Sequence, residues 1–378
     1  MEEQHHPELV GKPFAVGGRP DQRGVVSSCS YAARQQGVHS AMPTAQAIRI
    51  CPGLILIPGN HSAYREASEK VMQILRDVTP LVEQISIDEA FLDVSDLSDD
   101  LDVFARSLQK RIKENTDLPC SIGGAVNKLV AKMATDYGKA SHKSGGYPNA
   151  ITIIAPGKER TFLAQLPVKN LWGVGPKTTE KLKRLGILTI GDLAAKPLEF
   201  LIKNFGKWGY DLLAHARGED DQPVTIEHAV KSISQEVTYD RDVSDGSILM
   251  RTLQEQADQV GYRLRQEGLC GNVVRIKLRW PDFTTLTRQI TLDLPTDADG
   301  VIAAEAINLF ERVWEPGRAV RLLGVGVSGL SACAHQLSLF DDTPEKERKL
   351  LSAVDLLRQK YGKNIVRRGS SINKRKNG

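Results

Sequence analysis

The chain has 378 residues, a length that predicts roughly two to four domains. Hydrophobic residues make up 41% of it, which is a globular composition, and no apolar run approaches the about 18 residues that a membrane span needs. The start, Met1-Glu2-Glu3-Gln4, lacks the basic and apolar regions of a signal peptide, so we expect a cytoplasmic protein. The cysteines (Cys29, Cys51, Cys120, Cys270 and Cys333) form no Cys-x-x-Cys pair, and we expect neither a disulfide framework nor a zinc site.

The net charge of +4 is concentrated at the C-terminal end. Residues 343–378 hold 11 basic and 3 acidic side chains, whereas residues 1–342 hold 39 basic and 43 acidic ones. A basic tail alone is weak evidence for nucleic acid, because such tails are often only solvated. Basic stripes inside folded segments are stronger evidence.

Residues 1–60 are short elements punctuated by turns, which suggests a small insert. The pattern predicts a strand at Val25 to Ser28, a short helix from Tyr31 and a helix opened by Pro43. Tyr31 and Arg34 lie three apart on the short helix, so they share one face. A guanidinium suits bidentate phosphate recognition and a phenol can donate to the same group, although an ordinary exposed helix pair is the alternative.

Residues 61–150 predict the order αββαβ. A helix leads to a hairpin at 82–94, and a second helix leads to a strand at Cys120 to Val126. This is a ferredoxin-like unit without its first strand. The strand would have to precede Met1 or come from residues 1–60.

The hairpin carries the most informative stretch, Ser86-Ile87-Asp88-Glu89-Ala90-Phe91-Leu92-Asp93. Adjacent Asp88 and Glu89 interrupt an apolar strand pattern, and unpaired anions in a half-buried strand are costly unless a cation compensates them. Such oxygen ligands suit a hard divalent ion such as magnesium, whereas the alternative is a solvated hairpin tip. Because neighbouring strand residues face opposite ways, both carboxylates reach one site only if the strand bends or bulges there.

A helix after the Cys120 strand carries a second basic set. Lys128, Lys132 and Lys139 recur at spacings that could place them on one face. An ordinary polar helix face is enough to explain Lys128 and Lys132. Lys139, which follows Gly138 at the expected helix end, is placed where a cation could meet a triphosphate.

Residues 155–225 predict short helices around Trp172-Gly173-Val174-Gly175-Pro176-Lys177. Gly173 and Gly175 let the backbone approach a ligand closely, and the helix that starts at Pro176 aims free N–H groups at an anion. Together with Lys177 they suit a helix-hairpin-helix phosphate clamp that does not read sequence. A plain turn between helices is the alternative.

Residues 231–330 predict the order βαββαβ, which we interpret as a ferredoxin-like sheet with two helices on one face and the other face free. In the strand Asn272 to Trp280, apolar residues alternate with Arg275, Lys277 and Arg279. The three cations therefore point the same way, roughly 6 to 7 Å apart, a spacing that resembles successive phosphates on one nucleic-acid strand. An ordinary solvated strand face is the alternative.

Four motifs together resemble a known family. They are Ser30-Tyr31-Ala32-Ala33-Arg34 with Gly37-Val38-His39-Ser40-Ala41-Met42-Pro43, the acidic stretch, Asn127-Lys128-Leu129-Val130-Ala131-Lys132, and Gly173-Val174-Gly175. In this order they are similar to the Y-family translesion DNA polymerases of the DNA polymerase IV (DinB) type, and the likeness spans almost the whole chain. It implies an α+β multidomain fold, with fingers at 1–60, a palm at 61–154, a helix-hairpin-helix thumb at 155–225, a βαββαβ little finger at 231–330 and a C-terminal tail at 331–378.

The resemblance also implies template-directed nucleotidyl transfer to a primer 3′ end with two magnesium ions. Asp88 and Glu89 would be metal ligands, Glu89 being the catalytic residue, and Tyr31, Arg34 and Lys139 would hold the deoxynucleoside triphosphate. Contacts to primer–template DNA would come from Gly173, Gly175, Lys177, Arg275, Lys277 and Arg279. The protein would act as a monomer.

The tail resembles a partner-binding peptide. Gln336-Leu337-Ser338-Leu339-Phe340 is similar to the pentapeptide with which such polymerases bind the replication sliding clamp, where Gln336, Leu337, Leu339 and Phe340 would fill a groove and pocket. An exposed Leu-Phe pair in a polar linker otherwise needs an explanation. A locally packed linker is the alternative. One further helix, with Leu350, Val354, Leu357 and Tyr361, follows.

The sequence departs from the family at its start. Family members begin with a strand that carries another metal-binding aspartate, followed by the bulky side chain that excludes ribonucleotides, and Met1-Glu2-Glu3-Gln4 aligns just after that segment. Three hypotheses follow: the protein starts upstream of Met1, it is a truncated DNA- and clamp-binding protein without catalysis, or it is a nucleic-acid-binding scaffold whose acidic hairpin is only structural.

Overall fold

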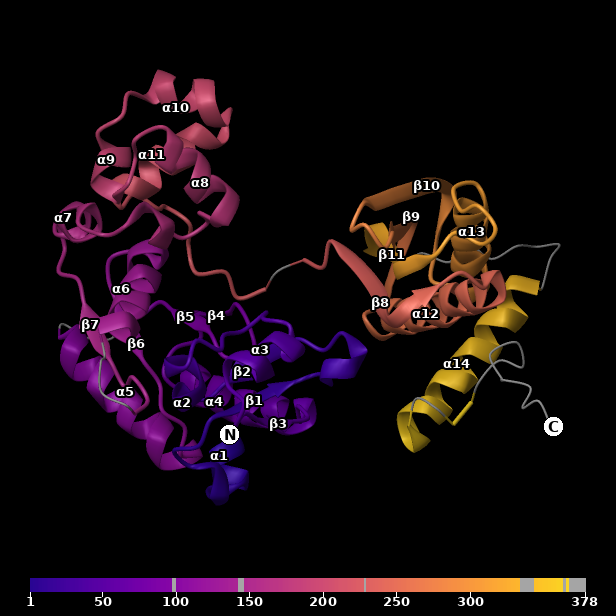
Figure 1. Cartoon of the computed structure of the whole chain (residues 1–378), viewed down its shortest axis with the longest axis horizontal. Coiled ribbons are helices and arrows are strands. Elements are labelled where there is room, and N and C mark those ends of the chain that lie inside the picture. The colour runs from indigo at the N-terminus through magenta and orange to yellow at the C-terminus, as the bar shows by residue number, and fades with distance from the viewer. Residues whose placement is uncertain (97–99, 142–145, 228, 334–342, 363–364, 367–378) are drawn as a thin grey trace. The chain divides into compact units, whose positions relative to one another are not determined.

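The computed structural model describes residues 1–96, 100–141, 146–227, 229–333, 343–362 and 365–366, apart from the side chains of 343–345 and 347. The chain divides into two compact units (Figure 1). Unit 1 comprises Met1–Pro20 and Gly24–His228, and unit 2 comprises Asp21–Arg23 and Ala229–Gly378. No helix within the described ranges is long and apolar enough to cross a membrane.

Unit 1 begins with a small three-stranded sheet. β1 (Phe14–Gly17) lies between β2 (Val26–Cys29), to which it is antiparallel, and β3 (Ile55–Ile57), to which it is parallel. The strand, the short helix and the Pro43-initiated helix that the sequence predicted are all confirmed. The helical elements here are α1 (Glu2–His5), η1 (Pro7–Leu9), η2 (Pro20–Gln22), α2 (Tyr31–Gln35) and α3 (Thr44–Ile50).

The predicted αββαβ order follows in unit 1. Its elements are α4 (His61–Arg76), β4 (Val82–Gln84), β5 (Ala90–Leu92), α5 (Leu101–Thr116) and β6 (Ile122–Gly124). After them come α6 (Lys128–Ser141) and β7 (Ile151–Ile153), a strand that the sequence pattern did not predict. Among the described strands, β4 pairs with β5 and β6 pairs with β7, so they form two separate pairs.

Short helices complete unit 1, as predicted. They are α7 (Glu159–Ala164), η3 (Val168–Asn170), α8 (Pro176–Arg184), α9 (Ile190–Ala194), α10 (Leu198–Phe205) and α11 (Trp208–Arg217). Their core includes the fully buried Leu163, Leu182 and Leu201, and it also contains Leu129 and Met133 of α6. The helical part is therefore packed on α6, which joins it to the segment that carries the acidic residues.

Unit 2 is an antiparallel four-stranded sheet with two helices on one face (Figure 1). The βαββαβ order is confirmed, but the strand order β10-β9-β11-β8 is not ferredoxin-like, because the last strand lies between the first two. Periodicity predicts each element without predicting which strands pair. The elements are β8 (Ser232–Val243), α12 (Gly246–Gln266), β9 (Leu269–Arg279), β10 (Thr285–Thr296), α13 (Asp299–Glu311) and β11 (Val320–Ala332).

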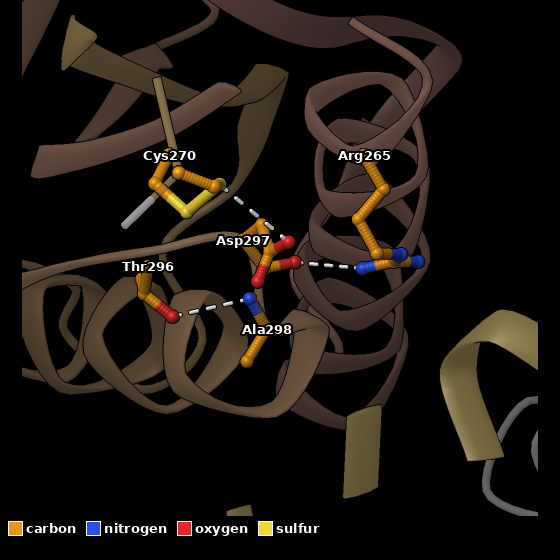
Figure 2. Close-up of a disulfide and its surroundings, with 6 residues drawn as sticks. Arg265, Cys270, Thr296, Asp297 and Ala298 are labelled. Carbon is orange, nitrogen blue, oxygen red and sulfur yellow. Dashed lines mark hydrogen bonds between the residues drawn. A yellow bond between two sulfur atoms is a disulfide. The ribbon is translucent and has the colours of Figure 1, made fainter. Parts of the chain in front are cut away.

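A disulfide joins Cys270 of β9 to Cys333, the residue after β11 (Figure 2). The expectation of no disulfide was wrong for this pair. The two cysteines are 63 residues apart in sequence, yet their Cα atoms lie 4.9 Å apart, because β9 and β11 are neighbouring strands. The pairing follows from the strand order, which cysteine spacing does not reveal. Cys29, Cys51 and Cys120 are free.

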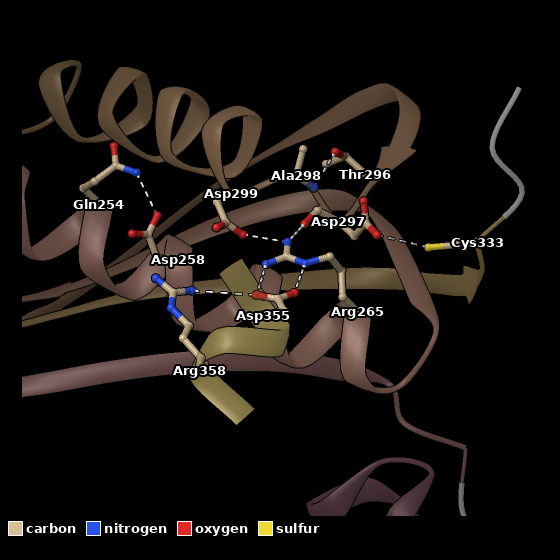
Figure 3. A network of polar contacts seen from close by, with 10 residues as sticks. All are labelled: Gln254, Asp258, Arg265, Thr296, Asp297, Ala298, Asp299, Cys333, Asp355 and Arg358. Atoms are coloured by element: carbon tan, nitrogen blue, oxygen red, sulfur yellow. Dashed lines mark hydrogen bonds and ion pairs between the residues drawn. The ribbon is translucent and has the colours of Figure 1, made fainter. Parts of the chain in front are cut away.

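The C-terminal helix α14 (Thr343–Tyr361) is held on unit 2 by a buried polar network (Figure 3). Arg265 of α12 donates to Oδ1 of Asp299 at 2.7 Å and to Oδ2 of Asp355 in α14 at 2.6 Å. None of these three side chains is more than 9% exposed. Leu351 of α14 is also buried, whereas Leu350, Leu357 and Tyr361 are exposed.

Candidate active site and nucleic-acid interface

Asp88 and Glu89 lie in the connection between β4 and β5, not within a strand. Residues 86–88 form a bend, and the N–H groups of Ile85 and Ser86 donate to the carbonyl of Glu89. Asp88 is exposed and accepts a hydrogen bond from the Ser86 hydroxyl at 2.6 Å, while Glu89 is partly buried. The bend removes the alternation of a regular strand, so the two adjacent carboxylates need not face opposite ways.

Lys132 of α6 holds the carboxylate of Glu89. Its Nζ donates to Oε1 of Glu89 at 2.8 Å and to Oδ1 of Asp136 at 3.1 Å. Burial lowers the pKa of Lys132, but the hydrogen bonds and charges of the two carboxylates outweigh it and leave the pKa raised. Lys132 is therefore charged, and the position between Glu89 and Asp136 is one that favours a cation.

A second lysine of α6, Lys128, is buried beside the same hairpin. Its Nζ donates to Oε2 of Glu83 in β4 at 2.8 Å, and the N–H of Thr225 donates to the same oxygen at 2.8 Å. Lys128 also lies 5.8 Å from the ring centroid of Phe91 in β5, and that ring is 5.8 Å from the ring of Trp172. The turn with Asp88 and Glu89 (the acidic turn), α6 and the loop with Gly173 and Gly175 (the glycine loop) therefore lie in the same part of unit 1. Glu83 was not predicted from the sequence, because a single carboxylate in a short strand gives no pattern.

Tyr31 and Arg34 share a helix face, as predicted. Ser30 caps α2 by accepting the N–H of Ala33, and the guanidinium of Arg34 lies 6.0 Å from the ring centroid of Tyr31. The ring of Tyr147 packs edge-on against Tyr31 at 5.5 Å, a contact that no sequence signal indicated. Burial raises the pKa of Tyr31, although the charge of Arg34 opposes this. The phenol is therefore a hydrogen-bond donor at neutral pH.

Lys139 is exposed in the last turn of α6, but the helix does not end at Gly138. Gly138 is buried, and an added Cβ would come 2.4 Å from Oγ1 of Thr152 in β7, so this glycine permits close packing of helix and strand. Tyr31 and Arg34 lie together on α2, and Lys139 lies in the last turn of α6.

The loop with Gly173 and Gly175 joins η3 to α8. Leu171 and Val174 anchor it in the core of unit 1, while the two glycines and Lys177 are exposed. Gly173 has a φ of +88°, and an added Cβ at either glycine would meet nothing within 4 Å. The first N–H groups of α8 have no partners within the helix. The loop therefore presents open backbone and a helix N-terminus to solvent.

The cationic strand of unit 2 is confirmed. Arg275, Lys277 and Arg279 lie on the half-exposed face of β9, whereas the residues between them are buried against the helices. Lys277 donates to Glu236 of β8 at 2.8 Å, and Nε of Arg279 donates to the Thr285 hydroxyl at 2.9 Å. The arrangement can bind anions along one strand.

Two predicted sites are incomplete within the described residues. Gln336, Leu337, Leu339 and Phe340 fall outside them. Asp88 and Glu89 belong to no compact group of three or more potential metal ligands in the part of the chain that the structure describes. The group found there is Cys270, Asp297 and Cys333, and its two sulfur atoms are bonded to each other.

Comparison with known proteins decides the family. The impB/mucB/samB family model matches residues 1–136, its C-terminal domain model matches residues 230–339, and the IMS family HHH motif matches residues 156–187. DNA polymerase IV of Dehalococcoides mccartyi (strain ATCC BAA-2266 / KCTC 15142 / 195) is 39% identical over 373 residues, which are 98% of this chain and 93% of the relative. The chain belongs to the DNA polymerase IV type of Y-family DNA polymerases.

Other relatives agree with this. DNA polymerase IV of Streptococcus mutans is 40% identical over 349 residues, 90% of this chain and 92% of that protein. A Y-family DNA polymerase chimera built from Dbh and Dpo4 has the same fold, with a TM-score of 0.76, 24% identity and coverage of 88% of this chain and 96% of that one. The family resemblance and the multidomain α+β fold are confirmed. Members of this type are DNA-directed DNA polymerases of translesion synthesis, and Y-family polymerases depend on divalent metal ions.

Proposed function

We propose that Asp88 and Glu89 form the metal-binding part of the polymerase active site, with Glu89 as the catalytic carboxylate. The observation that carries this proposal is the bend between β4 and β5, because it releases the two adjacent carboxylates from the alternation of a strand and leaves Asp88 exposed and Glu89 partly exposed. Oxygen donors of this kind suit magnesium, of which the reaction would use two ions. Bound magnesium supplies electrostatic stabilisation of the attacking primer 3′ oxygen and of the leaving pyrophosphate.

Tyr31, Arg34 and Lys139 would bind the deoxynucleoside triphosphate. The planar guanidinium of Arg34 can make two parallel hydrogen bonds to one phosphate. Tyr31 is protonated at neutral pH, so its hydroxyl can donate to a neighbouring phosphate oxygen. Lys139 is exposed near the end of α6 and would contribute a point charge. Together these residues would neutralise the charge that the triphosphate brings to the site.

Primer–template DNA would be held by its phosphates at two places. The exposed backbone at Gly173 and Gly175, with Lys177, would bind one strand from the thumb at 155–225, and Arg275, Lys277 and Arg279 would bind from the little finger at 231–330. Residues 1–60 would be the fingers and residues 61–154 the palm. We further propose a cytoplasmic monomer.

The tail at 331–378 would bind the replication sliding clamp through Gln336, Leu337, Leu339 and Phe340. Replacing both Leu339 and Phe340 by alanine should abolish clamp binding in a pull-down or surface plasmon resonance assay and should spare DNA binding. Unchanged clamp affinity would refute the assignment.

A second candidate function is DNA and clamp binding without catalysis. It is favoured by one observation, that Asp88 and Glu89 belong to no compact three-ligand group among the described residues. Primer extension separates the two candidates when the 378-residue chain is compared with a form that carries a further N-terminal strand with an aspartate. Extension by the longer form alone supports the second candidate for this chain, and robust extension by both supports the first.

A further inference from the structure

The middle cation of β9 is paired with an acidic residue two strands away. Nζ of Lys277 lies 2.8 Å from Oε2 of Glu236 on β8, although β11 runs between the two strands. Gly324 of β11 is the residue opposite both Lys277 and Glu236. The two side chains are 37% and 50% exposed, so solvent and ligands reach the pair.

Gly324 is what allows this contact. Neighbouring strands are about 4.8 Å apart, so β8 and β9 are separated by about 10 Å and a side chain on β11 would stand between them. An added Cβ at Gly324 would come 2.9 Å from Cβ of Glu236. Gly326 repeats the arrangement, because an added Cβ there would lie 3.0 Å from Cβ of Ser234 and 3.7 Å from Nη2 of Arg275.

The two glycines therefore leave a strip of bare backbone along β11, which we call the glycine strip (Gly324 and Gly326). Lys277 and Arg275 flank it on the β9 side, and Glu236 and Ser234 flank it on the β8 side. Within the described residues, neither Arg275 nor Arg279 is paired with a carboxylate, whereas Lys277 is. Glu236 therefore neutralises the central charge of a row of three.

We propose that Glu236 competes with DNA phosphate for Lys277, and that a backbone phosphate binds over the glycine strip by displacing it. This rests on the proposed DNA-binding function of the same face. The ammonium of Lys277 has three N–H donors, but a phosphate and the carboxylate of Glu236 are both anions and repel each other at the same cation, so binding of one disfavours the other. An exposed ion pair is weak, so a phosphate that is also held by Arg275 displaces Glu236. Glu236 thereby lowers the affinity of this face for DNA and favours release.

The variant Glu236→Gln tests the proposal, because it keeps the shape of the side chain and removes its charge. Fluorescence anisotropy with a labelled primer–template should show affinity raised by about two- to fivefold, the range that an exposed ion pair accounts for. The dependence of affinity on salt should become steeper, because Lys277 then meets phosphate without an opposing charge. Glu311→Gln is the matched control, because Glu311 is an exposed residue of α13, which packs on the opposite face of the sheet from Lys277. The affinity of this control variant for DNA should equal that of the unsubstituted protein.

A double-variant cycle shows whether Glu236 acts through Lys277. Lys277→Met alone should weaken binding, and adding Glu236→Gln to it should give no gain. An unchanged affinity of Glu236→Gln, or an equal gain in the Lys277→Met background, would overturn the proposal while leaving the DNA-binding function intact. If Lys277→Met alone leaves the affinity for DNA and its salt dependence unchanged, this face does not bind DNA. In that case both the proposed DNA-binding function of the face and the role of Glu236 are refuted.

Discussion

Two lysines of α6 hold acidic residues of the β4–β5 hairpin, and they differ in burial. Lys128 and Glu83 are 9% and 4% exposed, whereas Lys132 and Glu89 are 19% and 39% exposed. The first pair is cut off from water and is structural. The second faces the acidic turn, where its carboxylate remains accessible to a ligand. One helix thus fixes the hairpin through Glu83 and leaves the carboxylate of Glu89 partly exposed.

We predict that Lys128→Met destabilises the protein by about 3–5 kcal/mol, because it removes the cation of a buried ion pair and leaves the buried carboxylate of Glu83 in place. Urea unfolding followed by circular dichroism measures this. Adding Glu83→Leu should recover part of the loss, since the buried carboxylate is then removed as well. A loss below about 1 kcal/mol for Lys128→Met would show that the pair is not buried as described.

Local periodicity predicted the positions of some functional residues and not of others. The alternation in β9 and the pairing of Tyr31 with Arg34 on one face were predictable, because both follow from local periodicity. Placing Asp88 and Glu89 in a strand was wrong, because the hydrogen bonds that close the bend come from the backbone and leave no pattern of side chains.

At the level of elements, the loop before α8 offers a test that separates folding from binding. Gly175 has an ordinary φ of −80°, whereas Gly173 has a φ of +88° that favours glycine. Gly175→Ala should therefore leave the thermal midpoint unchanged and weaken DNA binding, because an added methyl group blocks close approach of a phosphate. Gly173→Ala should lower stability as well, by about 1 kcal/mol. Full DNA affinity in Gly175→Ala would refute the phosphate clamp.

The disulfide between β9 and the end of β11 should stabilise the chain. Cross-linking residues 63 apart restricts the unfolded chain, which contributes up to about 4 kcal/mol. Cys333→Ser should therefore lower the thermal midpoint, and a reducing agent should affect the unsubstituted protein but not the variant. Cys120→Ser, which removes a free thiol, is the control. Equal midpoints for Cys333→Ser and the unsubstituted protein would contradict the structural role.

Strand pairing explains most of what the sequence did not reveal. Helices and strands of unit 2 were predicted near their observed positions, because hydrophobic periodicity is a local signal. The insertion of β11 between β8 and β9 is not local. It brings Cys270 to Cys333 and Glu236 to Lys277, so neither contact could be predicted from spacing.

Across the whole molecule, the proposed contacts to DNA are of two kinds. The glycine loop of unit 1 offers backbone N–H groups, and β9 of unit 2 offers side-chain cations. Neither reads base edges, so binding should be largely independent of sequence and should weaken steeply with salt. We propose that catalysis depends in addition on Asp88 and Glu89.

Magnesium-dependent primer extension by the chain and by its Glu89→Gln variant tests whether Glu89 is the catalytic carboxylate. The variant should lose extension by at least about a hundredfold, as expected when a group that acts in the transition state is removed. Its affinity for primer–template DNA and its thermal midpoint should stay the same, because the glutamine amide oxygen can still accept from Lys132 and Lys132 keeps its ion pair with Asp136. A variant that extends primers as fast as the unsubstituted chain would contradict the account.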